Sequence, residues 1–380
     1  MDLRLNREDD EFRAELLDWL DNVQIPAGLR DYGLTPTAQD LGPAKAWQRL
    51  LWEGGWSCLA WPVEHGGRAA TAVQQAIFAE ELARRGLPRL LSIVGPDLAG
   101  PLIISEGTPA QREAFLPGIR TGTQLWCQLF SEPGAGSDLA GITTRAVQDG
   151  AGWRVTGQKV WTSAGHIAEV GLLMARTEAH KYKGISFFLL PMDRSGIEIR
   201  PLVQMDGESK FNEVFLEDVY VGPGDLLGSP GDGWRIAVSM LGRERLTLGA
   251  NAIGYRRALD ELRAAARENG VADDPVFRQR WAQLWSRVFL LRATWILALS
   301  SGADPTGPRM ALLKVLSTEI QRDLALLPED VFGSALVAGD AAAAWANRLL
   351  AAPGARLAGG TSEVQRNIIS ERVLGLPRGT

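Results

Sequence analysis

Hydrophobic residues recur at helical spacing through the first third of the chain. In residues 11–23, Phe12, Leu16, Trp19 and Leu20 fall on one face of an amphipathic helix. Glycines and prolines punctuate this region and separate it into several helical segments. The pattern therefore predicts an N-terminal helical domain over residues 1–122, with further helices at 44–52, 71–85 and 109–119.

The pattern changes between residues 123 and 228. Short apolar runs, partly alternating with polar residues, stand between clusters of Gly, Pro, Asp and Ser. Such runs predict strands of a small β-barrel or sandwich. No Gly-x-Gly-x-x-Gly motif opens a βαβ unit here, so a dinucleotide-binding Rossmann fold is not supported. The predicted strands include 153–156, 170–175, 185–190, 197–199 and 213–216.

Helical periodicity returns from residue 229 and continues to residue 380. The fold class predicted is therefore α+β, with a β-domain at 123–228 between two helical domains. The helices expected in the last domain are 233–268, 275–300, 308–327, 340–352 and 362–374.

Composition narrows the class of protein. Of the 380 residues, 46% are hydrophobic and 22% are charged, as in ordinary globular proteins. A net charge of −5 without a basic run predicts no nucleic-acid partner. The two cysteines, Cys58 and Cys127, form neither a disulfide framework nor a metal cluster, so no metal is expected. No run of about 18 apolar residues predicts a membrane span, and a polar N-terminus favours a cytoplasmic location.

Candidate chemistry lies at the edge of the predicted β-domain. Residues 131–138 read Ser-Glu-Pro-Gly-Ala-Gly-Ser-Asp and follow an apolar, strand-like run. Gly134 and Gly136 allow the backbone to approach a flat or anionic group closely. Downstream, Trp161 adds an aromatic plane beside Thr162 and Ser163. The combination suits a bound flavin, whereas the alternative is an ordinary turn with a core tryptophan.

These two motifs resemble the flavin-domain motifs of the acyl-CoA dehydrogenase family. The second reads Gln-Lys-Val-Trp-Thr-Ser at 158–163, and a third, Gly-Gly-Thr-Ser-Glu-Val-Gln-Arg at 359–366, is similar to the family's closing motif. The three motifs occur in the family's order and cover nearly the whole chain. The resemblance implies FAD as cofactor and a C-terminal four-helix bundle. It implies dehydrogenation of an acyl-CoA substrate to the trans-2-enoyl-CoA, with electrons passing to an electron-transferring flavoprotein.

The resemblance also implies a catalytic base. Many members carry it just before the Gly-Thr of the closing motif, where this chain has Gly359. The isovaleryl- and long-chain-type subset instead places a Glu on the first helix of the C-terminal bundle, and Glu244 stands at that position. The alternative for Glu244 is a surface carboxylate paired with a neighbouring arginine.

Further roles follow from the resemblance, position by position. The flavin contacts that it implies are made by Gln128, Phe130, Ser131, Trp161, Ser163, Thr361 and Glu363. The substrate contacts that it implies are made by Ser137, Arg245 and the backbone N–H of Gly359.

One departure from the family concerns the flavin pyrophosphate. The Arg-x-x-Phe-Gly segment, whose Arg grips the neighbouring subunit's flavin in common members, is replaced here by residues 269–275. Arg278 or Arg280 is an alternative, as is a different partner chain. Residues 369–378 are similar to bacterial members that act on bulky or steroid-side-chain thioesters, some of which are heteromers. The expected assembly is a homodimer, a homotetramer or a heterotetramer with a related subunit.

Two alternative functions remain open. The chain could be a flavin-dependent monooxygenase on the same fold, although that chemistry has little need for Glu244. It could also be a subunit of a heteromeric dehydrogenase that lacks full activity on its own.

Overall fold

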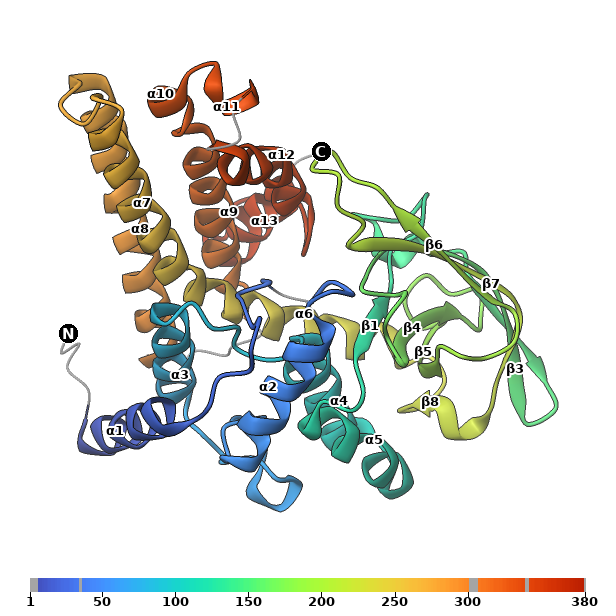
Figure 1. Ribbon diagram of the computed structural model, residues 1–380. Coiled ribbons are helices and arrows are strands. Elements are labelled where there is room, and N and C mark those ends of the chain that lie inside the picture. The colour runs from blue at the N-terminus through green and yellow to red at the C-terminus, as the bar shows by residue number, and fades with distance from the viewer. Residues whose placement is uncertain (1–5, 34–35, 301–306, 339–341, 379–380) are drawn as a thin grey trace.

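The computed structural model describes residues 6–33, 36–300, 307–338 and 342–378, with only the backbone described for 243–247, 300 and 338. Figure 1 shows a β-domain at one side of the molecule and a tall helical domain at the other. The predicted order of a helical, a β-rich and a second helical domain is confirmed. Among the described residues, none of the helices is both long and apolar enough to cross a bilayer.

The N-terminal domain consists of helices packed around large aromatic side chains. Thr71 and Thr108 begin α3 and α5 with capping boxes, in which Gln74 and Gln111 return a side-chain hydrogen bond. Trp47 and Trp56 are almost completely buried in the core of this domain. The helices are α1 (Arg7–Asn22), α2 (Leu41–Glu53), α3 (Ala72–Arg84), α4 (Gly100–Glu106) and α5 (Pro109–Thr121).

The β-domain is one sheet in which strands distant in sequence become neighbours. The order along the sheet is β6-β7-β3-β2-β4-β5-β8, and β1 pairs in parallel with β4. The strands are β1 (Trp126–Leu129), β2 (Arg145–Asp149), β3 (Gly152–Ser163), β4 (Val170–Arg176), β5 (Ile185–Pro191), β6 (Ile197–Leu202), β7 (Phe211–Val221) and β8 (Leu226–Leu227).

The sheet is curled, so that β4 and β5 are buried on both faces. Leu173 and Phe188 pack with Val155 and Val214 of β3 and β7, inside the curl. The alternate residues, such as Leu172, pack outward against helices of the N-terminal domain and α6. This explains why β4 and β5 read as continuous apolar runs rather than as alternating strands.

The C-terminal domain is helical, and α6 links it to the β-domain. Ile236, Ala237 and Met240 of α6 pack beside β5 and the short π-helix at Val94–Ala99, and Figure 1 shows α6 running between the two domains. The helices are α6 (Gly233–Thr247), α7 (Asn251–Glu268), α8 (Pro275–Ser300), α9 (Met310–Leu326), α10 (Glu329–Phe332), α11 (Ala335–Ala338), α12 (Ala343–Leu357) and α13 (Ser362–Ile368), followed by a π-helical turn at Ile369–Val373.

The single helix predicted over 233–268 is interrupted by a 3₁₀ turn at Leu248–Ala250. The cause is tertiary, because the backbone of Gly249 lies directly against the indole of Trp295. A Cβ on Gly249 would lie 2.0 Å from Cγ of that ring. The start predicted at residue 340 for another helix lies outside the described residues, and α12 is described from Ala343.

Candidate active site

The glycine-containing turn after β1 is closed by its own backbone hydrogen bonds. Backbone hydrogen bonds join Glu132 and Ala135 in both directions, at 3.1 and 3.0 Å. Ser137 is exposed at the end of the turn. A Cβ added to Gly134 or Gly136 would meet no other part of the chain within 4 Å. The turn therefore leaves open space on its outer side, where a bound group can approach the backbone.

Trp161 projects from a β-bulge at the end of β3. The pairing of β3 with β7 shifts register between Lys159 and Thr162, and both of these side chains are fully buried. Trp161 between them has a left-handed backbone (φ 59°) and is 59% exposed. Its ring meets Phe211 edge-on, with centroids 6.0 Å apart. A bulky residue in this region costs about 1–3 kcal/mol and persists only where the surrounding structure imposes it.

The turn and the bulge are joined by direct contacts. The N–H of Val160 donates to the carbonyl of Ser131 at 2.9 Å. Nζ of Lys159 donates to Oε1 of Glu132 at 2.8 Å and to the carbonyl of Phe130 at 3.1 Å. The structure therefore brings Phe130 and Ser131 beside the segment that carries Trp161 and Ser163, although the two motifs are separated in sequence.

The Glu132–Lys159 pair is buried, and burial has a different net effect on the pKa of each residue. Burial acts to raise the pKa of Glu132, but Lys159 and the donors of Thr143 and Thr144 outweigh it and lower that pKa to about 2. Burial lowers the pKa of Lys159 to about 8, against the opposing effect of Glu132. Glu132 is consequently ionised throughout the physiological range.

The side chains around the turn fit a flavin. Nε2 of Gln128 and Oγ1 of Thr162 are buried without a hydrogen-bond partner from the described part of the protein. Buried polar atoms of this kind call for a partner. Strand alternation places Gln128 on the same face of β1 as Phe130. An isoalloxazine ring offers carbonyl and ring-nitrogen acceptors together with a flat face, which matches amide and hydroxyl donors beside an exposed indole.

The closing motif forms a tight loop before α13. Gly359 and Gly360 are both left-handed, with φ of 64° and 90°. Thr361 caps α13 by accepting from the N–H of Val364 at 3.2 Å, and Glu363 in the first turn is exposed. Nε2 of the buried Gln365 donates a hydrogen bond to the carbonyl of Gly359 at 3.1 Å. Helix α13 and its loop are thus one hydrogen-bonded unit.

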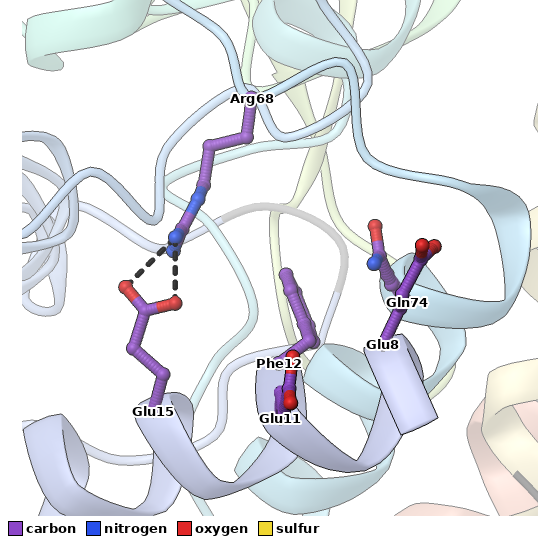
Figure 2. A pocket seen from close by; sticks show the side chains of 6 residues that line it. All are labelled: Glu8, Glu11, Phe12, Glu15, Arg68 and Gln74. Atoms are coloured by element: carbon purple, nitrogen blue, oxygen red, sulfur yellow. Dashed lines mark hydrogen bonds and ion pairs between the residues drawn. The ribbon is translucent and has the colours of Figure 1, made fainter. Parts of the chain in front are cut away.

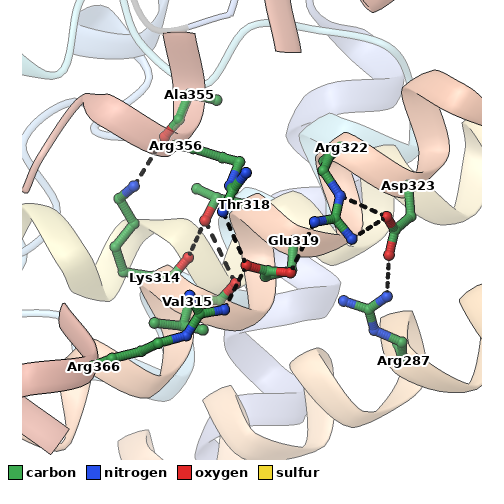
Figure 3. Close-up of polar contacts among 10 residues, drawn as sticks. All are labelled: Arg287, Lys314, Val315, Thr318, Glu319, Arg322, Asp323, Ala355, Arg356 and Arg366. Carbon is green, nitrogen blue, oxygen red and sulfur yellow. Dashed lines mark hydrogen bonds and ion pairs between the residues drawn. The ribbon is translucent and has the colours of Figure 1, made fainter. Parts of the chain in front are cut away.

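An ion pair attaches α13 to α9, as Figure 3 shows. Glu319 on α9 accepts from Arg366 at 2.8 Å and lies 3.5 Å from Arg322 and 3.7 Å from Arg356. Asp323, one turn later, pairs with Arg322 at 2.7 Å. The position of the closing motif therefore depends on a carboxylate in the core helix of the C-terminal domain.

The predicted base lies on α6, but its side chain is outside the described part of the structure. The same holds for Arg245. The helix itself is described through Thr247, and position 244 comes one turn after Met240. Met240 and Ile236 are fully buried between the β-domain and the N-terminal helices. The roles of Glu244 and Arg245 stay predictions.

Two surface hollows lie away from these motifs. One, of about 300 Å³, is lined by Glu8, Glu11, Phe12, Glu15, Arg68 and Gln74, and Figure 2 shows Arg68 held there by Glu15. The other, of about 160 Å³, lies between α8 and α9 and includes Arg280 and Arg287. Arg280, one of the predicted alternatives for the flavin pyrophosphate, is paired with Asp330 at 2.5 Å. Arg280 is therefore already neutralised within its own chain.

Sequence reasoning missed the pairing of Glu132 with Lys159, although both residues stand in the motifs. A signal was present, because Lys159 shares strand parity with Val155 and so falls on the inward face of β3. It also missed the contact between Nδ1 of His166 and Oδ1 of Asn212 at 3.0 Å, just after Ser163. Strand register is needed to place these partners, and the sequence does not reveal it.

Comparison with known proteins agrees with the geometry. Residues 6–123, 127–219 and 231–374 match the N-terminal, middle and C-terminal domains of acyl-CoA dehydrogenases. The acyl-CoA dehydrogenase IpdE1 of Mycobacterium tuberculosis is 40% identical, over 97% of this chain and 98% of its own length. FadE26 of the same organism is 31% identical, over 98% of both chains.

Two solved structures are similar over the whole length of both chains. The steroid acyl-CoA dehydrogenase Tcur3481-Tcur3483 has a TM-score of 0.86 at 28% identity. The ChsE4-ChsE5 complex of Mycobacterium tuberculosis has a TM-score of 0.84 at 29% identity. Motifs, fold and relatives agree: the chain belongs to the acyl-CoA dehydrogenase family and is an oxidoreductase of that type.

Proposed function

We propose that this protein uses FAD to oxidise the Cα–Cβ bond of an acyl-CoA thioester, giving the trans-2-enoyl-CoA. The observation that carries the proposal is the junction of the Ser131 turn with the Trp161 bulge through the Val160 hydrogen bond and the Lys159–Glu132 pair. That junction brings the Ser131 turn beside the segment that carries the exposed Trp161 and Ser163, and the orphaned amide of Gln128 stands on β1 just before the turn. FAD supplies the hydride acceptor, and we propose an electron-transferring flavoprotein as the next acceptor.

The chain's own residues would share the work of proton removal. Glu244 takes the α-proton, and a site that excludes water raises the pKa of such a carboxylate toward the working pH. The α-proton of a thioester is weakly acidic, so the carbonyl oxygen must be polarised as charge develops on it. The backbone N–H of Gly359 is the proposed donor. Ser137 and Arg245 complete the substrate contacts.

The flavin contacts divide between the two ends of the cofactor. The backbone of Gln128 and Phe130, with Ser131, would meet the pyrimidine end of the ring, while Ser163 would meet its central nitrogen. Trp161 would cover one face. Thr361 and Glu363, at the start of α13, would contact the adenosine part. An anionic Glu363 at that helix start is favoured by backbone hydrogen bonding, which lowers its pKa.

For the substrate we propose a bulky acyl group of the steroid-derived class. Support comes from the structural match to the steroid acyl-CoA dehydrogenase Tcur3481-Tcur3483, which covers this chain completely. The heteromeric alternative has support as well, since ChsE4-ChsE5 is a complex of two chains. The pairing of Arg280 with Asp330 leaves Arg278 or a different partner chain as the remaining predicted grip on the flavin pyrophosphate.

The test is anaerobic mixing of the purified, flavin-loaded protein with acyl-CoA thioesters, followed by flavin absorbance. We expect bleaching, fastest with a steroid-side-chain thioester, and a loss of about 10²–10⁴-fold in Glu244→Gln. Glu268→Gln, at the exposed end of α7, is the matched control and should bleach like the unmodified protein. Bleaching by Glu244→Gln at the normal rate would move the base elsewhere. Flavin binding only after a related subunit is added would establish the heteromeric alternative.

A further inference from the structure

Glu132 and Lys159 form a buried pair whose polar groups are well satisfied. The side chain of Lys159 is 0% exposed and that of Glu132 is 4% exposed. Beyond Lys159, Glu132 accepts from the N–H and Oγ1 of Thr143 at 2.6 and 2.8 Å, and from the N–H of Thr144 at 3.0 Å. Burying two charges is expensive, and an apolar pair of the same volume is often as stable. Stability by itself therefore gives no reason for charges at this place.

The position of the pair suggests its role. Glu132 is the second residue of the Ser131 turn, and Lys159 is the last buried residue before the bulge. Lys159 and the N–H of Val160 fasten the chain just before the left-handed Trp161. The fully buried Thr162 follows directly. The exposed indole is thus carried by backbone that is fixed on both sides and hydrogen-bonded to the Ser131 turn.

We propose that Glu132 and Lys159 are positioning residues that hold the Trp161 plane and Ser163 in register with the Ser131 turn, so that both segments contact one flavin ring. The inference rests on the proposed function for the identity of the ring. The pair does not touch reacting atoms. The pair fixes the distance and angle between the Ser131 turn and the Trp161 segment. Along the chain, these two segments are connected only through the β2–β3 hairpin.

The other reading is that the pair only stabilises the domain. A matched pair in the same domain separates the two readings. Arg194 and Asp225 form a two-pronged ion pair at 2.7 and 2.8 Å, with 27% and 14% exposure. This pair lies at the opposite end of β3, near Trp153. Trp153 and Ser163 are about 30 Å apart along the strand.

The test compares Lys159→Met with Asp225→Asn in the flavin-loaded protein, using the heteromeric complex if flavin requires it. The readouts are the dissociation constant for FAD, the fluorescence of bound flavin, the unfolding temperature and the separate kcat and KM. Stacked indole quenches flavin fluorescence, so Trp161→Leu gives the unquenched reference. We expect Lys159→Met to bind FAD about 10-fold more weakly. Its bound flavin should fluoresce like that of Trp161→Leu, and kcat should fall more than KM rises. Asp225→Asn should lower only the unfolding temperature.

A double variant guards against simple misfolding. Glu132→Gln with Lys159→Met removes both charges and leaves none uncompensated, so its unfolding temperature should recover. Its FAD affinity and flavin quenching should stay impaired, because the tether between the segments is gone. The proposal is overturned if Lys159→Met or the double variant keeps normal FAD affinity and quenching. Failure of the proposed function looks different: the unmodified protein would bind FAD, yet acyl-CoA would not bleach it.

Discussion

Glu319 offers a measurable link between the C-terminal core and the closing motif. Its carboxylate, 14% exposed, is the common partner of Arg322, Arg356 and Arg366. In Glu319→Gln the shape is kept while the charge is lost. The direct bond to Arg366 then becomes weaker by about 1 kcal/mol, a value from the low part of the range because this arginine is half exposed. The two longer contacts contribute about 0.3 kcal/mol each.

The expected loss is therefore about 1.5 kcal/mol, of which about 1 kcal/mol, from the bond to Arg366, acts where α13 meets α9. A change of about 1.4 kcal/mol alters an equilibrium tenfold, so a loss of about 1 kcal/mol should make local opening of α13 about 5-fold more frequent. Amide hydrogen exchange reports this directly, for example at the N–H of Gln365, which bonds to the carbonyl of Thr361. FAD retention should fall in parallel if Thr361 and Glu363 contact its adenosine part.

The matched control is Arg378→Gln. It removes a 3.2 Å pair with Glu371 in which the arginine side chain is 83% exposed, so the expected loss is below about 0.5 kcal/mol. Exchange at α13 that stays unchanged in Glu319→Gln would refute the reasoning. Equal acceleration in α13 and in the distant α1 would also refute it, because the effect would then be global rather than local.

Three further expectations follow from the site and its supports. We propose that the exposed indole of Trp161, which would cover one flavin face, also lies where electrons leave the flavin. Trp161→Phe should therefore slow reoxidation of the flavin by its acceptor more than reduction by substrate; stopped-flow traces of both half-reactions check this, and equal slowing contradicts it. In the folded protein the pKa of Glu132 is about 2, below its ordinary 4.5. Its contribution to the free energy of unfolding is therefore complete above pH 4.5 and is lost as the pH falls toward 2. That contribution is on the order of 3 kcal/mol, and urea unfolding at several pH values should show a shallower acid slope in Glu132→Gln. Gly249→Ala should destabilise the C-terminal domain by about 1–3 kcal/mol, because its Cβ would meet the Trp295 ring at 2.0 Å; thermal unfolding checks this, and Gly254→Ala, which meets nothing within 4 Å, is the control.

Periodicity predicted the division into helical, β and helical domains because each domain buries one face of its elements at a regular spacing. It did not predict the break at Gly249, where a poor helix former lies directly against the indole of Trp295, because that contact depends on how α8 packs against the turn. The motifs located the residues of the candidate site. They could not show that Lys159 reaches Glu132, because that contact depends on the bulged register of β3 against β7.

The closing loop bears on where a base can stand. Its two glycines adopt φ of 64° and 90°, a region that costs residues with a Cβ about 1 kcal/mol or more. At Gly360 a Cβ would also lie 2.5 Å from Nε2 of Gln365, the group that closes the loop onto Gly359. In this conformation the loop favours glycine, which exposes backbone N–H groups, and disfavours a residue that carries a carboxylate side chain. We propose that the base comes instead from α6, which is packed between the β-domain and the N-terminal helices up to Met240; Glu244, one turn later, is the proposed residue.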